Sequence, residues 1–484
     1  MTSSENAEKK DEKTEKKAGW LSTLNFDGYM AAIVAFCLYM PDQVLSVSSK
    51  HATVSLLVPS HNTGIYMTKL YATKTLSNFT GSLSMFVVNM FLPANKWISS
   101  ISLLFLLTVR IILMVSYYLP NAAVWFYYSF MAQAFIRGLF ENNFYPLAAD
   151  HMSVISLSYK GSKLIIWTLQ VLMDLIVPGK ATAMISVHLA IMMLINIAAF
   201  GGWTWSLLPR CETPKCVPIV VLDKKRGSSE SMTSVKPAPK NAENNESMWT
   251  IIKRIYSPFL MCMFGWPQKN FYSPGIIPYS LVDRSLCHAI NIALMFFTFI
   301  VTFVIHMVKQ YFKSLSQPWG KPPKGWHVTW LFIIPTIGCM PIIYHAMHYP
   351  GEIIHRVFRN NRVTTTLLYV ILVCSTTVLD TFGYIGVSAC SKDELGRRGK
   401  NANRTIAMTS FSAQFVTSVT YRMSTGYLIV WKKYVDDIAN VAPTEDMNWF
   451  GRVGFWISNS VREGGYDFVD EFKGNIWEIV KDEA

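Results

Sequence analysis

The chain has 484 residues, of which 51% are hydrophobic, 14% aromatic and only 15% charged. Soluble domains carry roughly 25% charged residues, so this composition excludes an ordinary soluble enzyme and a disordered protein. A bilayer span takes roughly 20 apolar residues, and the chain has room for about eleven spans with loops and tails. The formal net charge is +13. In a membrane protein such an excess is typical of loops that face the cytosol, so we expect no nucleic-acid partner.

The chain begins with a polar, charge-dense stretch. Residues 1–26 predict a disordered cytosolic N-terminus without a cleaved signal peptide. Beyond it, apolar runs predict eleven transmembrane helices, at 27–49, 65–92, 97–119, 122–149, 153–177, 182–208, 250–272, 286–312, 327–349, 364–390 and 404–432. The second run is the most polar, because it carries Lys69, Lys74 and Asn78. It can span only if one face is buried in protein or lines water. The seventh run is expected to be broken by its prolines.

The spans fall into two groups. Residues 27–208 predict an N-terminal bundle of six helices, and 250–432 predict a C-terminal bundle of five. Between them, 209–249 are rich in Lys, Ser, Pro and Asn and predict a flexible cytosolic linker. The Lys and Arg residues outside the spans gather mainly in this linker and in 391–404, with Lys160 counted among the inner loops. The positive-inside rule then places the N-terminus in the cytosol and, after an odd number of spans, the C-terminus outside.

The C-terminal segment 433–484 is acidic and carries a helical stripe of Trp and other apolar residues that begins near Trp449. We expect an amphipathic tail. Two alternatives remain open from the sequence: a helix in the membrane interface, or a helix docked on the bundle.

Charged residues inside spans are costly, so each one requires a reason. Arg137 and Glu141 are spaced i,i+4 on one helix face, and Asn142 follows them. One interpretation is an internal ion pair that faces the bundle. The other is the polar wall of a substrate cavity. Asp380 is a lone acid in another span, with either a substrate or gating role or a structural hydrogen bond.

The first span contains a proline beside two polar side chains. Met40, Pro41, Asp42 and Gln43 lie there in sequence. At depth in the membrane these residues would line a cavity, whereas near the outer end they would merely mark the end of the helix.

Motifs of metal-dependent or nucleophilic catalysis are missing from the sequence. It contains no H-E-x-x-H, no Walker A motif and no G-x-S-x-G. Cys211 and Cys216 have no second pair that would complete a zinc site. We therefore expect no catalytic residues, no metal and no cofactor, and a protein that is not an enzyme.

The layout of six spans, a long cytosolic loop and five spans resembles the equilibrative nucleoside transporter family. The segment around Pro41 is similar to the Leu-Pro-Trp-Asn-like end of that family's first span. Phe382, Gly383 and Tyr384 resemble its Asn-Gly-Tyr segment in the tenth span. The family's Asp-x-x-Gly-Arg segment in span 8 has no counterpart, because 296–306 are apolar apart from Thr and a His.

The resemblance implies an all-α polytopic membrane protein with a major-facilitator-like two-bundle architecture. It further implies facilitated diffusion of nucleosides, nucleobases or similar small polar solutes by alternating access. The residues expected in the substrate cavity are Met40, Asp42, Gln43, Arg137, Glu141, Asn142 and Asp380. The expected partners are the lipid bilayer, most simply the plasma membrane, and a small solute. The departure in span 8 leaves an alternative, a transporter-fold protein without transport activity that acts as a surface or scaffold component.

Overall fold

A computed structural model describes residues 26–59, 63–177, 179–206, 246–272, 276–277, 280–282, 284–320, 325–393, 396–436, 442–444, 446–473 and 476–480. In its first half the helices are α2 (Phe26–Leu38), α3 (Met40–Ser55), α4 (Thr63–Phe91), α5 (Lys96–Ser116), α6 (Ala122–Leu147), α7 (Met152–Ile176) and α8 (Ala181–Trp205). A 3₁₀ turn, η2 (Ala149–His151), links α6 to α7.

The second half contains α9 (Met248–Phe271), α10 (Arg284–Tyr311), α11 (Ile333–His348), α12 (Ile353–Phe358), α13 (Arg362–Cys390), α14 (Lys400–Trp431), α15 (Trp449–Lys473) and α16 (Ile476–Val480). Short 3₁₀ segments, η4 (Lys313–Ser316) and η5 (Gly325–Phe332), precede α11, and the π-helical turn η6 (Lys432–Asp436) follows α14. No strand occurs among the described residues.

Helix length and composition confirm the predicted all-α membrane fold. Within the described part of the chain, six segments are long and apolar enough to cross a bilayer: Phe26–Ser49, Lys96–Ser116, Ala181–Trp205, Ala293–Tyr311, Gly325–His348 and Arg362–Cys390. Of the described helices of similar length that are more polar, five lie at the other predicted spans, namely α4, α6, α7, α9 and α14, and the sixth is α15 in the tail. Together the six apolar segments and the first five of these polar helices match the eleven predicted spans closely. The five polar helices can lie in a membrane because their polar residues face protein rather than lipid.

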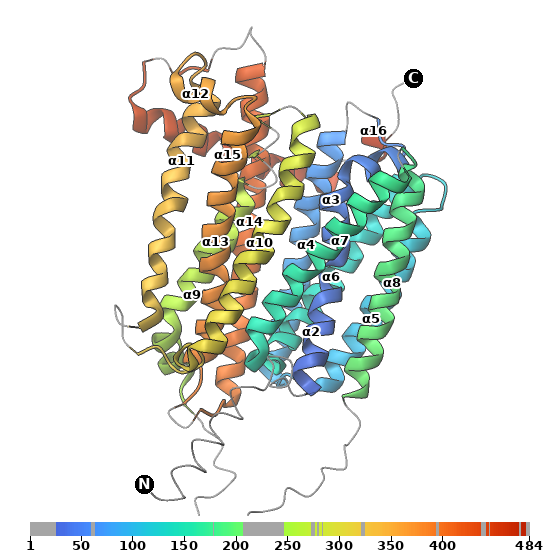
Figure 1. Ribbon diagram of the computed structural model, residues 1–484, viewed down its shortest axis with the longest axis vertical. Helices are drawn as coiled ribbons and strands as arrows, with labels where there is room; N and C mark the ends of the chain where they lie inside the picture. Colours follow the sequence, from blue (N-terminus) through green and yellow to red (C-terminus); the bar gives the residue numbers. More distant parts are fainter. Residues whose placement is uncertain are drawn as a thin grey trace, which may run out of the picture.

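The long helices form two groups that contact each other mainly through α14 and α10 of the second half (Figure 1). Helices α2 to α8 pack mainly on one another, and α9, α10, α11 and α13 pack in the other half. Helix α14 lies between α9 of its own half and α4 and α6 of the first half. Helix α10 packs against α7 and adds a second contact between the halves.

The first predicted span is broken in its middle. Helix α2 ends at Leu38, and Tyr39 has φ −103° and ψ 3° before α3 begins. Pro41 occupies the first turn of α3, where its missing N–H costs nothing. The break therefore lies at depth within the span, and Asp42 and Gln43 follow it in the interior of the bundle rather than at a helix exit.

The prolines of the seventh span do not break it, contrary to the sequence-based expectation. Helix α9 continues through Pro258 and Pro267, and Pro274 lies outside the described residues. A Cβ added at Gly383 or Gly386 of α13 would meet α9 at 2.7 Å, so the two helices approach closely. Such tight packing supports a proline-containing helix, because neighbouring groups compensate for the lost hydrogen bond.

Helices α4 and α6 also cross closely. A Cβ added at Gly138 would overlap the backbone of Asn78 and lie 2.7 Å from the amide nitrogen of Ser82, and one added at Gly81 would overlap the carbonyl oxygen of Phe135. Small residues at such a crossing let two membrane helices pack backbone to backbone. This crossing brings the polar faces of the two helices together.

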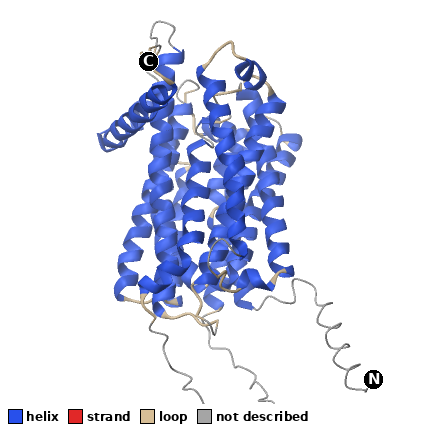
Figure 2. Ribbon diagram, turned by 90° about the vertical axis from the view of Figure 1, so that its left-hand side faces the viewer, coloured by secondary structure: helices blue, strands red, loops and turns tan. Residues whose placement is uncertain are grey.

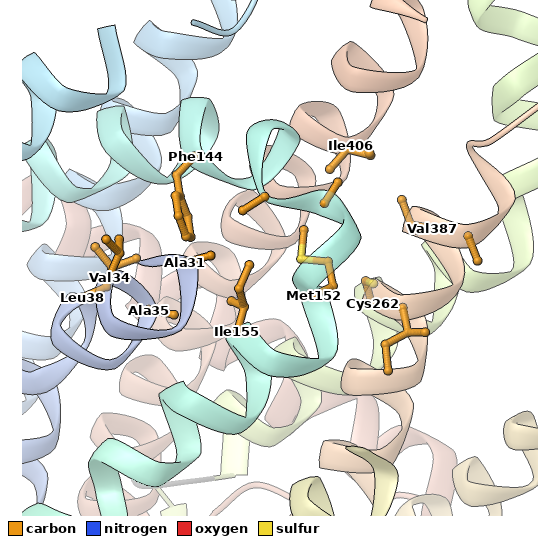
Figure 3. Close-up of a cluster of buried hydrophobic side chains, with 14 of the residues drawn as sticks. Ala31, Val34, Ala35, Leu38, Phe144, Met152, Ile155, Cys262, Val387 and Ile406 are labelled. Atoms are coloured by element: carbon orange, nitrogen blue, oxygen red, sulfur yellow. The ribbon is translucent and has the colours of Figure 1, made fainter. Parts of the chain in front are cut away.

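The two ends of the bundle are packed differently. At one end, called here the linker end, α8 ends and α9 begins (Figure 1). One apolar cluster there joins both halves, with Phe144 of α6, Cys262 of α9 and Ile406 of α14 (Figure 3). At the opposite, tail end the buried apolar residues divide into two clusters. One is built almost entirely from α3 to α8, and the other from α9 to α15.

The C-terminal helix α15 packs against α14 and leans across the tail end (Figure 2). A Cβ added at Gly464 would lie 2.5 Å from the carbonyl oxygen of Arg422, so the two helices are in close contact. Arg422 also pairs with Asp467 at 2.9 Å, and Trp456 of α15 is buried. These contacts correspond to the docked-helix alternative for the tail.

Candidate functional site

Arg137 of α6 joins two carboxylates in the interior of the first half. Its Nη1 lies 2.5 Å from Oδ2 of Asp42, and its Nε lies 3.3 Å from Oε1 of Glu141. Arg137 and Glu141 are buried, and the Asp42 side chain is 12% exposed. An unpaired charge in such surroundings would be strongly destabilising, so each of these groups depends on the others.

Helix α4, one of the more polar of the predicted spans, contributes Lys74 and Asn78 to this network. Lys74 Nζ lies 3.0 Å from Oδ2 of Asp42, and the Asn78 side-chain oxygen accepts a hydrogen bond from Arg137 Nε at 3.3 Å. Lys74, Asn78 and Ser82 are spaced by four residues, which places them on one face of α4. That face lies against α6. The four ionised groups of this network, two acids and two bases, sum to a formal charge of zero.

Gln414 of α14 links this network to the second half. Its amide nitrogen donates a hydrogen bond of 2.5 Å to Oε2 of Glu141. Its oxygen accepts hydrogen bonds from Asn78 and from Ser82, the latter at 3.0 Å. The network is thus shared between α4 and α6 on one side and α14 on the other.

Aromatic side chains surround the same network. The Arg137 guanidinium lies 5.0 Å above the ring of Tyr39, which suits a cation–π interaction. The Tyr39 hydroxyl lies 2.7 Å from the Tyr145 hydroxyl, and its ring centroid lies 4.3 Å from that of Tyr159. Because Tyr39 stands at the break between α2 and α3, the break positions both an aromatic ring and Asp42.

Three further residues that were expected in a substrate cavity, Met40, Gln43 and Asn142, carry no charge and lie beside this network. Met40 is fully buried in the apolar cluster of the first half. Gln43 is buried beside the hydroxyl of Tyr159. Asn142 donates a 2.5 Å hydrogen bond to the Ser82 carbonyl and so contributes to the contact between α4 and α6.

Asp380 of α13 lies in a second group of charges. Its electrostatic partners are Lys160 of α7 and Lys269 of α9. Lys163 lies one turn beyond Lys160, and both ammonium groups approach the Tyr159 ring, at 4.6 and 5.4 Å. Counting Lys160 among the inner loops was wrong, because the structure places it inside α7 with 3% exposure.

The two groups of charges interact with each other. Lys163 is coupled electrostatically to Asp42 and Lys74, and Lys269 is also coupled to Lys74. We call the combined set the charged core; it comprises Asp42, Lys74, Arg137, Glu141, Lys160, Lys163, Lys269 and Asp380. With five bases and three acids, its formal charge is +2. Its members come from α3, α4, α6 and α7 in the first half and from α9 and α13 in the second.

Polar contacts close the linker end. Asp150 of η2 accepts ion pairs from Lys392 and Arg398, each at 2.9 Å. The Ser388 hydroxyl donates a 2.5 Å hydrogen bond to the Ala149 carbonyl. Burial opposes ionisation of Asp150, but the Arg398 guanidinium and the Lys392 ammonium offset it and keep the pKa of that carboxyl below its ordinary value. These contacts reinforce the apolar cluster that joins the halves at the same end.

A pocket of about 410 Å³ opens beside these ion pairs. It is lined by Asn89, Pro93, Ala94, Pro146, Arg397, Arg398, Gly399, Lys400, Asn403, Arg404 and Ala407. Arg398 is held by Asp150 and Arg397 by Asp393, so part of this positive charge is already neutralised. The pocket contains no residue of the charged core.

No family model matches the sequence, and no curated protein matches it. The structure is similar to the crystal structure of a bacterial homologue of the iron transporter ferroportin in the outward-facing state. The sequence identity is 10%, the match covers 93% of this chain and 99% of the other, and the TM-score is 0.47. Among the described residues no three His, Cys, Asp or Glu side chains gather to hold a metal ion.

Proposed function

We propose that the protein is a multi-spanning membrane transporter that moves a small polar solute by alternating access, with the charged core as the solute site. The observation that carries this proposal is a set of eight ionisable side chains within membrane-spanning helices, five of them buried and three partly buried. A charge near the bilayer centre costs roughly 2.5–3.5 kcal/mol on insertion scales. A purely structural helix contact has no need of so many charges.

The unequal packing of the two ends supports the same proposal. Alternating access requires two halves that can separate at one end while they stay closed at the other. The linker end has a shared apolar cluster and the ion pairs of Asp150, whereas the tail end has a separate cluster in each half. We propose that these linker-end contacts form a gate that breaks when the site opens to that side.

Residues of both halves would meet the solute. Arg137 and Glu141 on α6 are connected to α14 through Gln414, and Asp380 on α13 lies within electrostatic reach of Lys160 on α7. A solute that binds residues of both halves at once would favour conformations in which the two halves close around it. This coupling of binding to closure is how a carrier uses differential affinity to shift its conformations.

The test is uptake into liposomes that contain the purified full-length protein. The solutes are adenosine and hypoxanthine, which the family resemblance suggests, together with phosphate, succinate and adenosine monophosphate. We expect saturable uptake of at least one solute without a sodium or proton gradient, and loss of most uptake in Glu141→Gln. The exposed loop residue Lys180 supplies the control, because Lys180→Gln leaves the charged core intact.

Absence of uptake of all five solutes by well-folded protein would contradict the transport proposal. Equal uptake by the parent protein and Glu141→Gln would instead remove Glu141 from the solute site.

A further inference from the structure

We propose that the solute is an organic or inorganic anion with carboxylate or phosphate groups, held by Lys160, Lys163 and Lys269. This inference rests on the proposed transport function and specifies the chemical class of its solute. It differs from the neutral nucleosides and nucleobases that the family resemblance suggests.

The three lysines are an unbalanced set of buried cations. Lys160 is 3% exposed and Lys163 is 9% exposed, and Lys269 is partly buried. Among the described residues, none of the three forms an ion pair with a carboxylate, although Asp380 lies within their electrostatic reach. Lysine is rarely buried unless it is paired, so this arrangement lacks anions.

The neighbouring charges do not supply the missing anions. Of the acids in the charged core, Asp42 is already shared between Arg137 and Lys74, at 2.5 and 3.0 Å. Glu141 is engaged by Arg137 and by Gln414. Asp380 lies within electrostatic reach of Lys160 and Lys269, and among the described residues it forms no ion pair. The formal charge of +2 therefore resides on the side of α7, α9 and α13, and a dianion would balance it.

One hydrogen-bond acceptor of Asp380 is unpaired among the described residues, which indicates that Asp380 and the three lysines do not satisfy one another completely. Oδ1 of Asp380 is buried, and it has no hydrogen-bond partner within the described part of the chain. Buried polar atoms are nearly always paired, so an orphaned one suggests a site that a ligand or water completes. A bound anion would draw the lysines together and leave Asp380 to accept a hydrogen bond from one of them or from a protonated group of the ligand.

The surrounding aromatic rings suit a site in which lysines bind an anion. The Tyr159 ring lies against both Lys160 and Lys163 and makes a tilted contact with the Tyr39 ring, so its face is occupied by cations while its hydroxyl lies near Gln43. Cation–π contacts position the ammonium groups without neutralising them. Their positive charge thus remains available to a carboxylate or phosphate, which prefer such charge-assisted hydrogen bonds.

The experiment compares anionic and neutral solutes in the same liposomes. Phosphate, succinate and adenosine monophosphate are the anionic probes, and adenosine and hypoxanthine are the neutral ones. We expect saturable uptake of one or more anions and no uptake of either neutral purine. Because a charged solute carries current, uptake should also give a transient electrical signal whose sign corresponds to inward movement of negative charge.

Variants of the lysines tie the uptake to this site. Lys163→Gln and Lys160→Gln should each reduce anion uptake by about tenfold or more, since a hydrogen bond to a charged group is lost. Lys163→Arg keeps the charge and should retain a measurable share of the uptake, which separates loss of charge from loss of folding. Lys180→Gln in the exposed loop is the matched control and should leave uptake unchanged.

The possible results are distinct. Uptake of adenosine or hypoxanthine without uptake of any anion would overturn this inference while supporting the transport function. Anion uptake that persists in both glutamine variants would also overturn it, because the lysines would then not form the site. Failure of all five probes would contradict the transport function and this inference together.

Discussion

Asp42 and Arg137 are joined by an ion pair of 2.5 Å that connects the break between α2 and α3 to the middle of α6. The two residues are 95 positions apart in the sequence. The break after Leu38 turns Asp42 toward α6, and the crossing of α4 and α6 brings Lys74 to the same carboxylate. The break between α2 and α3 thus positions Asp42 within the charged core.

Removal of Arg137 should destabilise the protein strongly. Arg137→Gln leaves Asp42 and Glu141 as buried carboxylates without their shared partner, and breaking a buried pair costs about 3–5 kcal/mol. Thermal unfolding of the detergent-solubilised protein measures this loss. Arg137→Gln combined with Asp42→Asn should recover part of it. Arg462→Gln, on the exposed face of α15, should have little effect. Equal stability of Arg137→Gln and the parent would contradict the described network.

The crossing of α4 and α6 should not tolerate a larger residue. In Gly138→Leu the new side chain would collide with the backbone of Asn78 and Ser82, and forcing extra atoms into a packed site costs about 1–3 kcal/mol or more. The matched control is Gly201→Leu on α8, because no atom lies within 4 Å of a Cβ there. Melting temperature and yield of monodisperse protein report the difference. A control that is as unstable as Gly138→Leu would show that any added apolar side chain is harmful.

Adjacent glycines on α15 test how the tail is attached. Gly464 faces α14 and its added Cβ would overlap the Arg422 backbone, whereas no atom lies within 4 Å of a Cβ at Gly465. Gly464→Leu should displace α15 and expose Trp456, and Gly465→Leu should not. Limited proteolysis of the tail and quenching of tryptophan fluorescence measure the displacement. The same protection of the tail in both variants would count against the docked position.

The sequence could predict some features of the fold and of the charged core but not others. Span positions followed from apolar runs, because each helix must cover roughly the same bilayer thickness. Arg137, Glu141 and Asp380 stood out because charges are rare in spans. Lys160 and Lys163 were missed: a lysine near a span boundary is typical of a loop, and only the packing of α7 against the second half shows that they are buried. Gln414 gave no signal, since its role depends on how α14 lies against α6.

The proposed gate at the linker end should respond to acid. The pKa of Asp150 is lowered in the folded protein, so its ion pairs stabilise the closed end fully above the unfolded value of about 3.9. That stabilisation is lost as the pH falls through the lower folded value. Asp150 is largely exposed, which keeps its energetic contribution small.

At neutral pH, Asp150→Asn should imitate this acid effect and open the linker end more often. A cysteine at Ser153, whose hydroxyl accepts a hydrogen bond from Lys309, reports the opening through its rate of labelling by a membrane-impermeant thiol reagent. We expect faster labelling in Asp150→Asn than in the parent with the same reporter. Equal rates would show that these ion pairs do not hold the end closed.

The most direct test of the central claim is whether solution reaches the charged core from each side of the membrane in turn. Ser156 of α7 lies beside Thr381 of α13, with their hydroxyl oxygens 3.4 Å apart, and it is one turn from Lys160. Ser156→Cys, in a chain whose eight native cysteines are replaced by alanine and whose uptake is retained, is labelled from either face of the liposome. The account predicts labelling from both faces, slowed by the transported solute. Protection from both faces, with or without solute, would contradict it and favour a sealed scaffold.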